Sequence, residues 1–91
     1  VMNHGACRLH IFKSDQNRRL FLELLAETVL LFNIEVHAYC LMDNHFHLLI
    51  RTPFPNLSKA IQYLSSVYTI RYNKLEKKDG PLFRGRFKSK L

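Results

Sequence analysis

The segment that decides the fold is Tyr39-Cys40-Leu41-Met42-Asp43-Asn44-His45-Phe46-His47-Leu48-Leu49-Ile50. Strand-forming residues stand on both sides of Asp43-Asn44, and Asp and Asn both tolerate the left-handed conformation that a two-residue hairpin turn needs. We therefore predict two antiparallel strands, over residues 34–42 and 45–51, joined at this turn. Since residues two apart in a strand share a face, the two histidines after the turn should lie side by side.

The loop length also predicts the register of the two strands. A two-residue loop pairs Met42 with His45, Cys40 with His47, and Ala38 with Leu49. One face carries small or flexible residues around the histidines, namely Val36, Ala38, Cys40, Met42, His45, His47, Leu49 and Arg51. The other face is bulky and apolar, and it carries Tyr39, Leu41, Phe46, Leu48 and Ile50, with Glu35 and His37 toward its far end. We assign this second face to the helices and the first face to a ligand.

Two helices are predicted, one before the hairpin and one after it. The first is capped near Ser14 or Asp15 and runs to about Phe32. The second starts near Asn56 or Ser58 and runs to about Lys77, before Asp79-Gly80-Pro81. Each has an apolar stripe at three- and four-residue spacing, formed by Leu20, Phe21, Leu24, Leu25, Thr28 and Phe32 in the first and by Leu57, Ile61, Leu64, Tyr68 and Tyr72 in the second.

A strand is expected at each end of the chain. Val1 and Met2 resemble the end of a strand, and residues 82–91 alternate so that Arg84, Arg86, Lys88 and Lys90 share one face. The resulting order of strand, helix, strand, strand, helix and strand predicts an α+β sandwich of ferredoxin-like type. Its sheet would be mainly antiparallel, with the two helices on one face.

Size and charge set the class of protein. Ninety-one residues make one domain, over residues 1–91, and 47% hydrophobic residues supply a core. There is no signal peptide and no apolar run near the ~18 residues of a membrane span, so a cytoplasmic protein is expected. Residues 71–91 hold eight Lys/Arg against two Asp/Glu, and this segment carries most of the net charge of +7. Such a segment favours a phosphate-binding surface, with a merely solvated tail as the alternative.

The chemistry-bearing residues centre on His45 and His47. Two neutral imidazoles on one strand suit a divalent metal ion, which in a phosphodiester-cleaving site polarises the phosphoryl oxygen. A third protein ligand is expected, and the nearby candidates are poor. The sulfur of Cys40 suits zinc better than Mg²⁺ or Mn²⁺, and Asp43 is expected to serve the turn. The alternative is that both histidines only decorate a strand, as His37 is expected to do.

The tyrosines are potential nucleophiles by chemistry. Tyr68 and Tyr72 fall on the apolar stripe of the second helix, however, and we therefore expect them to pack in the core. The basic strand is interpreted as a clamp on a phosphate backbone, with Arg84 and Arg86 suited to bidentate contacts. The alternative is a solvated edge strand that its charges protect from aggregation.

Taken together, these residues resemble the single-tyrosine HUH transposases of bacterial insertion sequences, particularly the REP-associated tyrosine transposases. The resemblance covers nearly the whole chain. It is carried by Asn3-x-Gly5, Ile11-Phe12, Phe21-Leu22-x-Leu24-Leu25, Ala38-Tyr39-x-Leu41-Met42-x-Asn44-His45-x-His47-Leu48-Leu49, Tyr68, Tyr72-Asn73 and Gly80-x-Leu82-Phe83-x-Gly85-Arg86-Phe87-Lys88-Ser89. The chain departs from the family at His4, where relatives usually carry Arg, and at Asp43, where many carry Pro.

The resemblance implies a DNA transposase catalytic domain that uses Mg²⁺ or Mn²⁺, held by His45 and His47. Its activity would be cleavage and rejoining of single-stranded DNA beside a hairpin through a 5′-phosphotyrosine. In relatives the tyrosine and a third metal ligand lie on a helix beyond the position of Leu91. The resemblance therefore implies a fragment without its nucleophile, in which neither Tyr68 nor Tyr72 takes that role and which does not cleave DNA alone.

Two other interpretations stay open at this point. One is a non-enzymatic nucleic-acid-binding module of similar shape, which would show aromatic side chains exposed on the sheet. The other is a domain stabilised by a partner, such as a homodimer, which is compatible with a transposase. A metal ion between His45 and His47 would favour the transposase.

Overall fold

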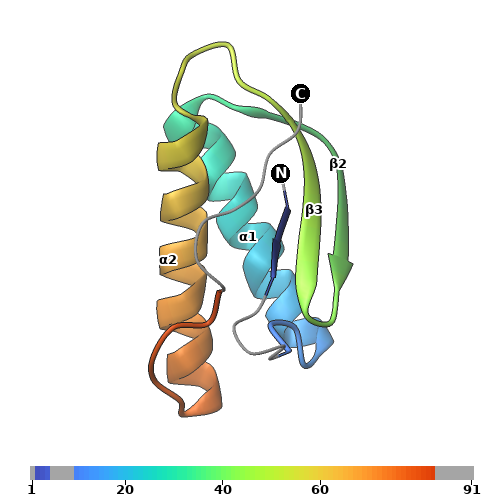
Figure 1. Cartoon of the computed structure of the whole chain (residues 1–91), viewed down its shortest axis with the longest axis vertical. Helices are drawn as coiled ribbons and strands as arrows, with labels where there is room; N and C mark the ends of the chain where they lie inside the picture. Colours follow the sequence, from blue (N-terminus) through green and yellow to red (C-terminus); the bar gives the residue numbers. More distant parts are fainter. Residues whose placement is uncertain (1, 5–9, 84–91) are drawn as a thin grey trace.

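Two helices and three strands make up the part of the chain that the structure describes. The structure is a computed structural model; it describes residues 2–4 and 10–83, with backbone and register alone for residues 2–4. The elements are β1 (Met2–His4), α1 (Asp15–Phe32), β2 (Glu35–Met42), β3 (His45–Arg51) and α2 (Leu57–Glu76). The strands form one antiparallel sheet in the order β1-β3-β2, so that β3 is central. Figure 1 shows the hairpin and the two long helices.

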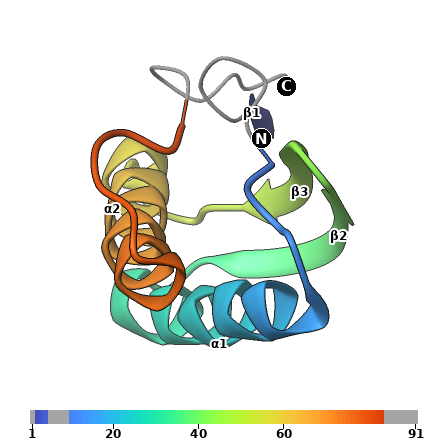
Figure 2. The ribbon, with the colours of Figure 1, turned by 90° about the horizontal axis from the view of Figure 1, so that it is seen from below.

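The predicted α+β sandwich is confirmed. Both helices lie on the same side of the antiparallel sheet, as Figure 2 shows along the long axis of the molecule. α1 packs against α2 and against β2. The strand predicted for the end of the chain lies, from residue 84 onward, outside the described residues.

The helix bounds agree with the predicted caps. Ser14 is the N-cap of α1, where its Oγ accepts a hydrogen bond from the backbone N–H of Asn17 at 3.3 Å. Asn33 ends this helix in the left-handed conformation, which Asn tolerates better than most residues. Asn56 precedes α2, and its side-chain amide donates to the carbonyl of Phe32 at 2.5 Å. This bond joins the end of the first helix to the start of the second.

The predicted register of the hairpin is confirmed from Ala38 to the turn, but it was wrong beyond that point. Met42 pairs with His45, Cys40 with His47, and Ala38 with Leu49. A β-bulge between Val36 and Ala38 then inserts His37 as an extra residue, so that Val36 and not His37 pairs with Ile50. Val36 consequently packs against the core, whereas we had assigned it to the open face. Tyr39, assigned to the helix side, is 56% exposed at the edge of the sheet.

The core is aromatic and lies between β3 and the helices. Phe21, Phe46 and Tyr68 are fully buried, with the rings of Phe21 and Tyr68 5.2 Å apart in an edge-to-face arrangement. Ile11 and Phe12 are equally buried, although they precede the first helix and belong to no predicted element. Burying each such side chain stabilises the fold by about 1.5–3 kcal/mol. The segment before α1 is thus part of the core and not a surface loop.

Candidate metal centre on the open face of the sheet

The structure brings the two predicted ligands together. His45 and His47 alternate on β3 with Phe46, which is fully buried against the helices, so the imidazoles occupy the opposite face. Their ring centroids are 5.1 Å apart, with an angle of 78° between the ring planes. His45 is half-buried and His47 is exposed. Because β3 is the central strand, the pair has a neighbouring strand on each side.

Asn44 orients the first imidazole. His45 Nδ1 and Asn44 Oδ1 are 2.8 Å apart. Since an amide oxygen only accepts hydrogen bonds, Nδ1 is the donor, and the lone pair of the neutral ring is on Nε2. Metal-binding histidines usually have this kind of support, which fixes both the tautomer and the direction of the ring.

Backbone and side-chain hydrogen bonds to Asp43 hold the turn that precedes His45. The carbonyl oxygen of Asp43 accepts two backbone hydrogen bonds, from Ile11 at 2.8 Å and from Phe12 at 3.1 Å. The Asp43 carboxylate accepts from Arg18 Nη2 at 2.9 Å, and Arg18 also lies 3.5 Å from Asp15. Asp43 therefore serves the turn, as expected, and its carboxylate is engaged by Arg18. Sequence reasoning missed Ile11, Phe12 and Arg18 as supports, because nothing in their local spacing points to a turn 25 or more residues away.

Tyr68 and Tyr72 hold the same N-terminal segment in place. The hydroxyl of Tyr68 donates to the carbonyl of Ile11, and that of Tyr72 donates to the carbonyl of His10 at 3.1 Å. Burial raises the pKa of both phenols. A nucleophilic tyrosine needs the opposite shift or an adjacent base. The expectation that both tyrosines pack in the core is confirmed.

The chemistry of the open face fits a bound metal ion in part. Two imidazoles whose ring centroids are 5.1 Å apart are close enough to bind one metal ion, because a ligating nitrogen lies about 2.0–2.1 Å from a metal such as zinc. Cys40 is exposed and pairs with His47 across the sheet. Among the described side chains, however, no three His, Cys, Asp or Glu residues are grouped as metal ligands are. Within that part of the chain the donor set is thus the histidine pair.

The comparison with known families decides the class of protein. The family described as transposase IS200 like matches residues 1–89. This chain belongs to the IS200-like transposase family. No curated protein gave a significant match. The resemblance to single-tyrosine transposases that we drew from the residues is therefore confirmed at the level of the family.

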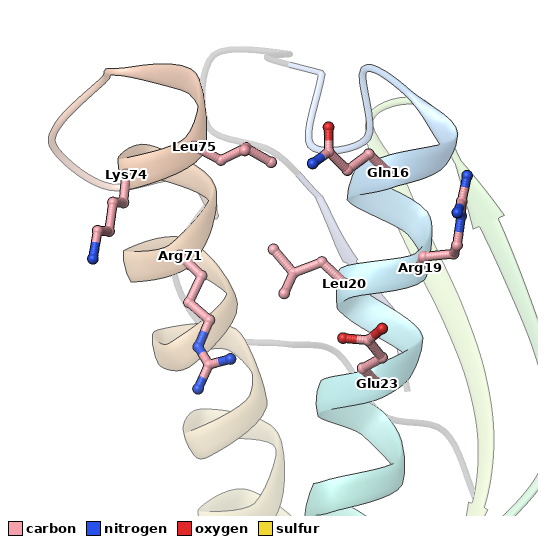
Figure 3. A pocket seen from close by; sticks show the side chains of 7 residues that line it. All are labelled: Gln16, Arg19, Leu20, Glu23, Arg71, Lys74 and Leu75. Atoms are coloured by element: carbon pink, nitrogen blue, oxygen red, sulfur yellow. The ribbon is translucent and has the colours of Figure 1, made fainter.

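In this IS200-like transposase, the helical layer has a hollow of its own. It measures about 1070 Å³ and lies between α1 and α2, with Leu20 and Leu75 directed toward the gap (Figure 3). The remaining lining residues are Gln16, Arg19, Glu23, Arg71 and Lys74. These side chains belong to the helices, whereas the histidines are on the sheet face turned away from them. The hollow is consequently separate from the candidate metal centre.

The predicted DNA-binding residues of the transposase are Arg84, Arg86, Lys88 and Lys90, and all four lie outside the described residues. Neither described helix has the length and hydropathy needed to cross a membrane. The net charge of +7 remains a property of the sequence as a whole.

Proposed function

We propose that this chain carries the metal-binding part of a DNA transposition centre. The complete centre, together with a nucleophilic tyrosine, cleaves and rejoins single-stranded DNA beside a hairpin through a 5′-phosphotyrosine. The observation that supports this function is the histidine pair on the open face of the sheet, in a chain that belongs to a transposase family. His45 and His47 hold a divalent ion, for which the family resemblance implies Mg²⁺ or Mn²⁺.

The ion, when bound, would polarise the phosphoryl oxygen of the scissile phosphodiester and stabilise the developing negative charge. The residues of the chain contribute position. Asn44 fixes the tautomer of His45, which places the lone pair of the neutral ring on Nε2. The anchored turn holds Asn44, because Asp43 beside it is bonded through both its backbone and its side chain.

None of the four tyrosines of the sequence is suited to be the nucleophile. Tyr68 and Tyr72 are buried and bonded to backbone carbonyls. Tyr63 donates to the Glu27 carboxylate at 2.5 Å, in the helical layer. Tyr39 is the neighbour of Cys40 in β2, so it alternates away from the face that carries His47. We infer that these 91 residues bind DNA but do not cleave it by themselves.

One experiment tests binding and cleavage together. The purified chain is incubated with a fluorescent single-stranded oligonucleotide that contains a hairpin, with and without Mn²⁺. We expect a change in anisotropy that Mn²⁺ strengthens and that His45→Ala weakens, with no covalent adduct on a denaturing gel. Equal affinity for duplex DNA and no effect of Mn²⁺ or of His45→Ala would contradict the proposed function. A covalent adduct that disappears in Tyr68→Phe would overturn the assignment of this tyrosine to the core.

The basic end of the chain offers a second test. We propose that Arg84 and Arg86 contact the phosphate backbone, and the double variant to Gln should lower affinity at ~0.1 M salt and flatten the dependence of log Kd on log salt by about one unit per lost contact. The matched control is the double variant Arg71→Gln/Lys74→Gln, which removes the same charge from the helical hollow. If both double variants weaken binding equally, net charge and not position explains the interaction.

The non-enzymatic alternative has less support. A base-stacking module would expose aromatic side chains on the sheet. The open-face residues that the structure describes on β2 and β3 are Ala38, Cys40, Met42, His45, His47, Leu49 and Arg51, and none of them is Phe, Tyr or Trp. Tyr39 is 56% exposed, but it alternates away from this face. This face therefore favours metal chemistry over base stacking.

A further inference from the structure

The hollow between α1 and α2 combines an apolar floor with basic sides. Leu20 and Leu75 form the floor, because both point into the gap between the helices, and Leu75 is 40% exposed (Figure 3). Arg19 and Lys74 are exposed, and they are directed away from the gap on its two outer sides. A ligand that fills the hollow therefore meets apolar surface in the middle and positive charge on both flanks.

The charges of the hollow are not neutralised within the part of the chain that the structure describes. Three cations, those of Arg19, Arg71 and Lys74, line it together with one carboxylate, that of Glu23. The ion pairs among the described residues include none of these four side chains. The hollow thus has an excess of positive charge that is available to a partner of negative charge.

The geometry of the charges restricts the kind of partner. A single phosphate group needs cations that converge on it, whereas the side chains of Arg19 and Lys74 diverge. A nucleic-acid backbone is contacted mainly by polar groups, so it would leave the leucine floor uncovered. An amphipathic helix suits both features, because its apolar stripe can enter a groove while charged residues on its sides contact the flanks.

We propose that the hollow between α1 and α2 docks an acidic amphipathic helix of a partner protein. Apolar side chains of that helix cover Leu20 and Leu75, and carboxylates on its two sides pair with Arg19 and Lys74. Glu23 repels carboxylates, so the acidic residues of the partner lie away from it. This surface is separate from the histidine pair, and docking there is independent of the proposed function.

The test is fluorescence anisotropy with the full 91-residue chain and a labelled probe peptide. The probe has three repeats of Glu-Leu-Ala-Glu-Leu-Glu-Glu, whose leucines form one stripe at three- and four-residue spacing. One control peptide has Lys in place of every Glu, and another has Ser in place of every Leu. We expect only the probe to bind, with an affinity that falls as salt rises but persists at ~0.5 M, because salt screens charges and not apolar contacts.

Charge variants of the hollow test the flanks. The double variant Arg71→Gln/Lys74→Gln should weaken binding of the probe about threefold or more, which is what two exposed charges contribute. Glu23→Gln should instead tighten binding, since it removes a like charge. The matched control is Arg51→Gln/Lys59→Gln, which removes two exposed charges outside the hollow and should leave the affinity within about twofold.

The variant Leu75→Gln tests the apolar floor. Leu75 is already partly exposed in the free chain, so the variant should keep the fold, which circular dichroism checks. Its affinity for the probe should fall about fivefold or more, because docking removes the leucine from water. Affinity equal to that of the parent chain would contradict docking on the leucine floor.

Four other results would refute docking in the hollow. They are no binding of the probe, equal binding of the serine peptide, an equal loss in both double variants, and displacement of the probe by a hairpin oligonucleotide. The last result would assign the hollow to nucleic acid. The proposed function is tested separately, because it depends on Mn²⁺ and His45→Ala, neither of which should alter binding of the probe.

Discussion

Removal of three tyrosine hydroxyls, one at a time, separates a structural role from a catalytic one. Tyr68→Phe, Tyr72→Phe and Tyr63→Phe make the same chemical change in three environments. The hydroxyl of Tyr68 is buried and bonded to the Ile11 carbonyl, that of Tyr72 is partly buried, and that of Tyr63 is exposed and bonded to Glu27. If these hydroxyls only support the fold, the loss of stability on removing each one must increase with its burial.

The magnitudes follow from what each deletion leaves behind. Tyr68→Phe strands a buried backbone acceptor, which costs about 1–3 kcal/mol, whereas Tyr72→Phe loses an ordinary bond worth about 0.5–1.5 kcal/mol. Tyr63→Phe should have no measurable effect, because water replaces an exposed partner. For a domain of this size each kcal/mol lowers Tm by roughly 4–8 °C, so Tyr68→Phe should lower it by at least about 4 °C.

Urea unfolding followed by far-UV circular dichroism at pH 7 provides the measurement. The three midpoints should rank Tyr63→Phe highest, Tyr72→Phe next and Tyr68→Phe lowest, with similar slopes, since the surface exposed on unfolding does not change. A Tyr68→Phe midpoint equal to that of Tyr63→Phe would refute the reasoning, because it would mean that the buried hydroxyl stabilises nothing. Unchanged stability together with altered DNA chemistry would instead indicate a catalytic tyrosine.

Two further predictions concern the same framework. Burial raises the pKa of Tyr68, so above about pH 10 the unfolded chain releases a proton that the folded chain retains; the free energy of unfolding then falls as pH rises. The free energy of unfolding of Tyr68→Phe, measured by urea titrations at pH 8–11, should fall less steeply with pH than that of the parent chain. Parallel dependences of the two proteins on pH would contradict this assignment. Asp43→Ala removes a mostly exposed ion pair with Arg18 and should cost at most about 1 kcal/mol, yet weaken Mn²⁺ binding in calorimetry because the turn before His45 loosens. Asp43→Asn, which retains turn propensity, is the control, and equal Mn²⁺ affinity in all three proteins would show that the turn does not position the histidine.

The hairpin could be predicted from the sequence because local chemistry determines it. Asp43 and Asn44 form the predicted two-residue turn, although neither adopts the left-handed conformation that was expected there. The loop length alone fixed the pairing of Cys40 with His47. The helix bounds were equally accessible, since Ser14 and the apolar spacing are local signals. The metal-binding role of the histidines is different, because it remains a prediction that titration must test.

The bulge at His37 was missed because strict alternation assumes that every residue of a strand is paired. A signal was nevertheless present. Strict alternation from Leu41 places the polar residues Glu35 and His37 on the apolar face, which is unfavourable. One extra residue in the strand reverses the alternation beyond it, so that Val36 faces the core instead. In this structure the bulge lies at the far end of the hairpin, so the register around the histidines was unaffected.

The supports of the site could not be predicted, because they join segments that are distant in sequence. Tyr68 bonds to the carbonyl of Ile11, Ile11 bonds through its N–H to Asp43, and Asp43 precedes the residue that orients His45. These bonds connect α2 to the segment before α1, that segment to the turn, and the turn to the open face of the sheet. A tyrosine that resembles a nucleophile by chemistry therefore supports, through these bonds, the turn that precedes His45. Destabilisation by Tyr68→Phe should accordingly be accompanied by weaker metal binding at temperatures where the variant is still folded.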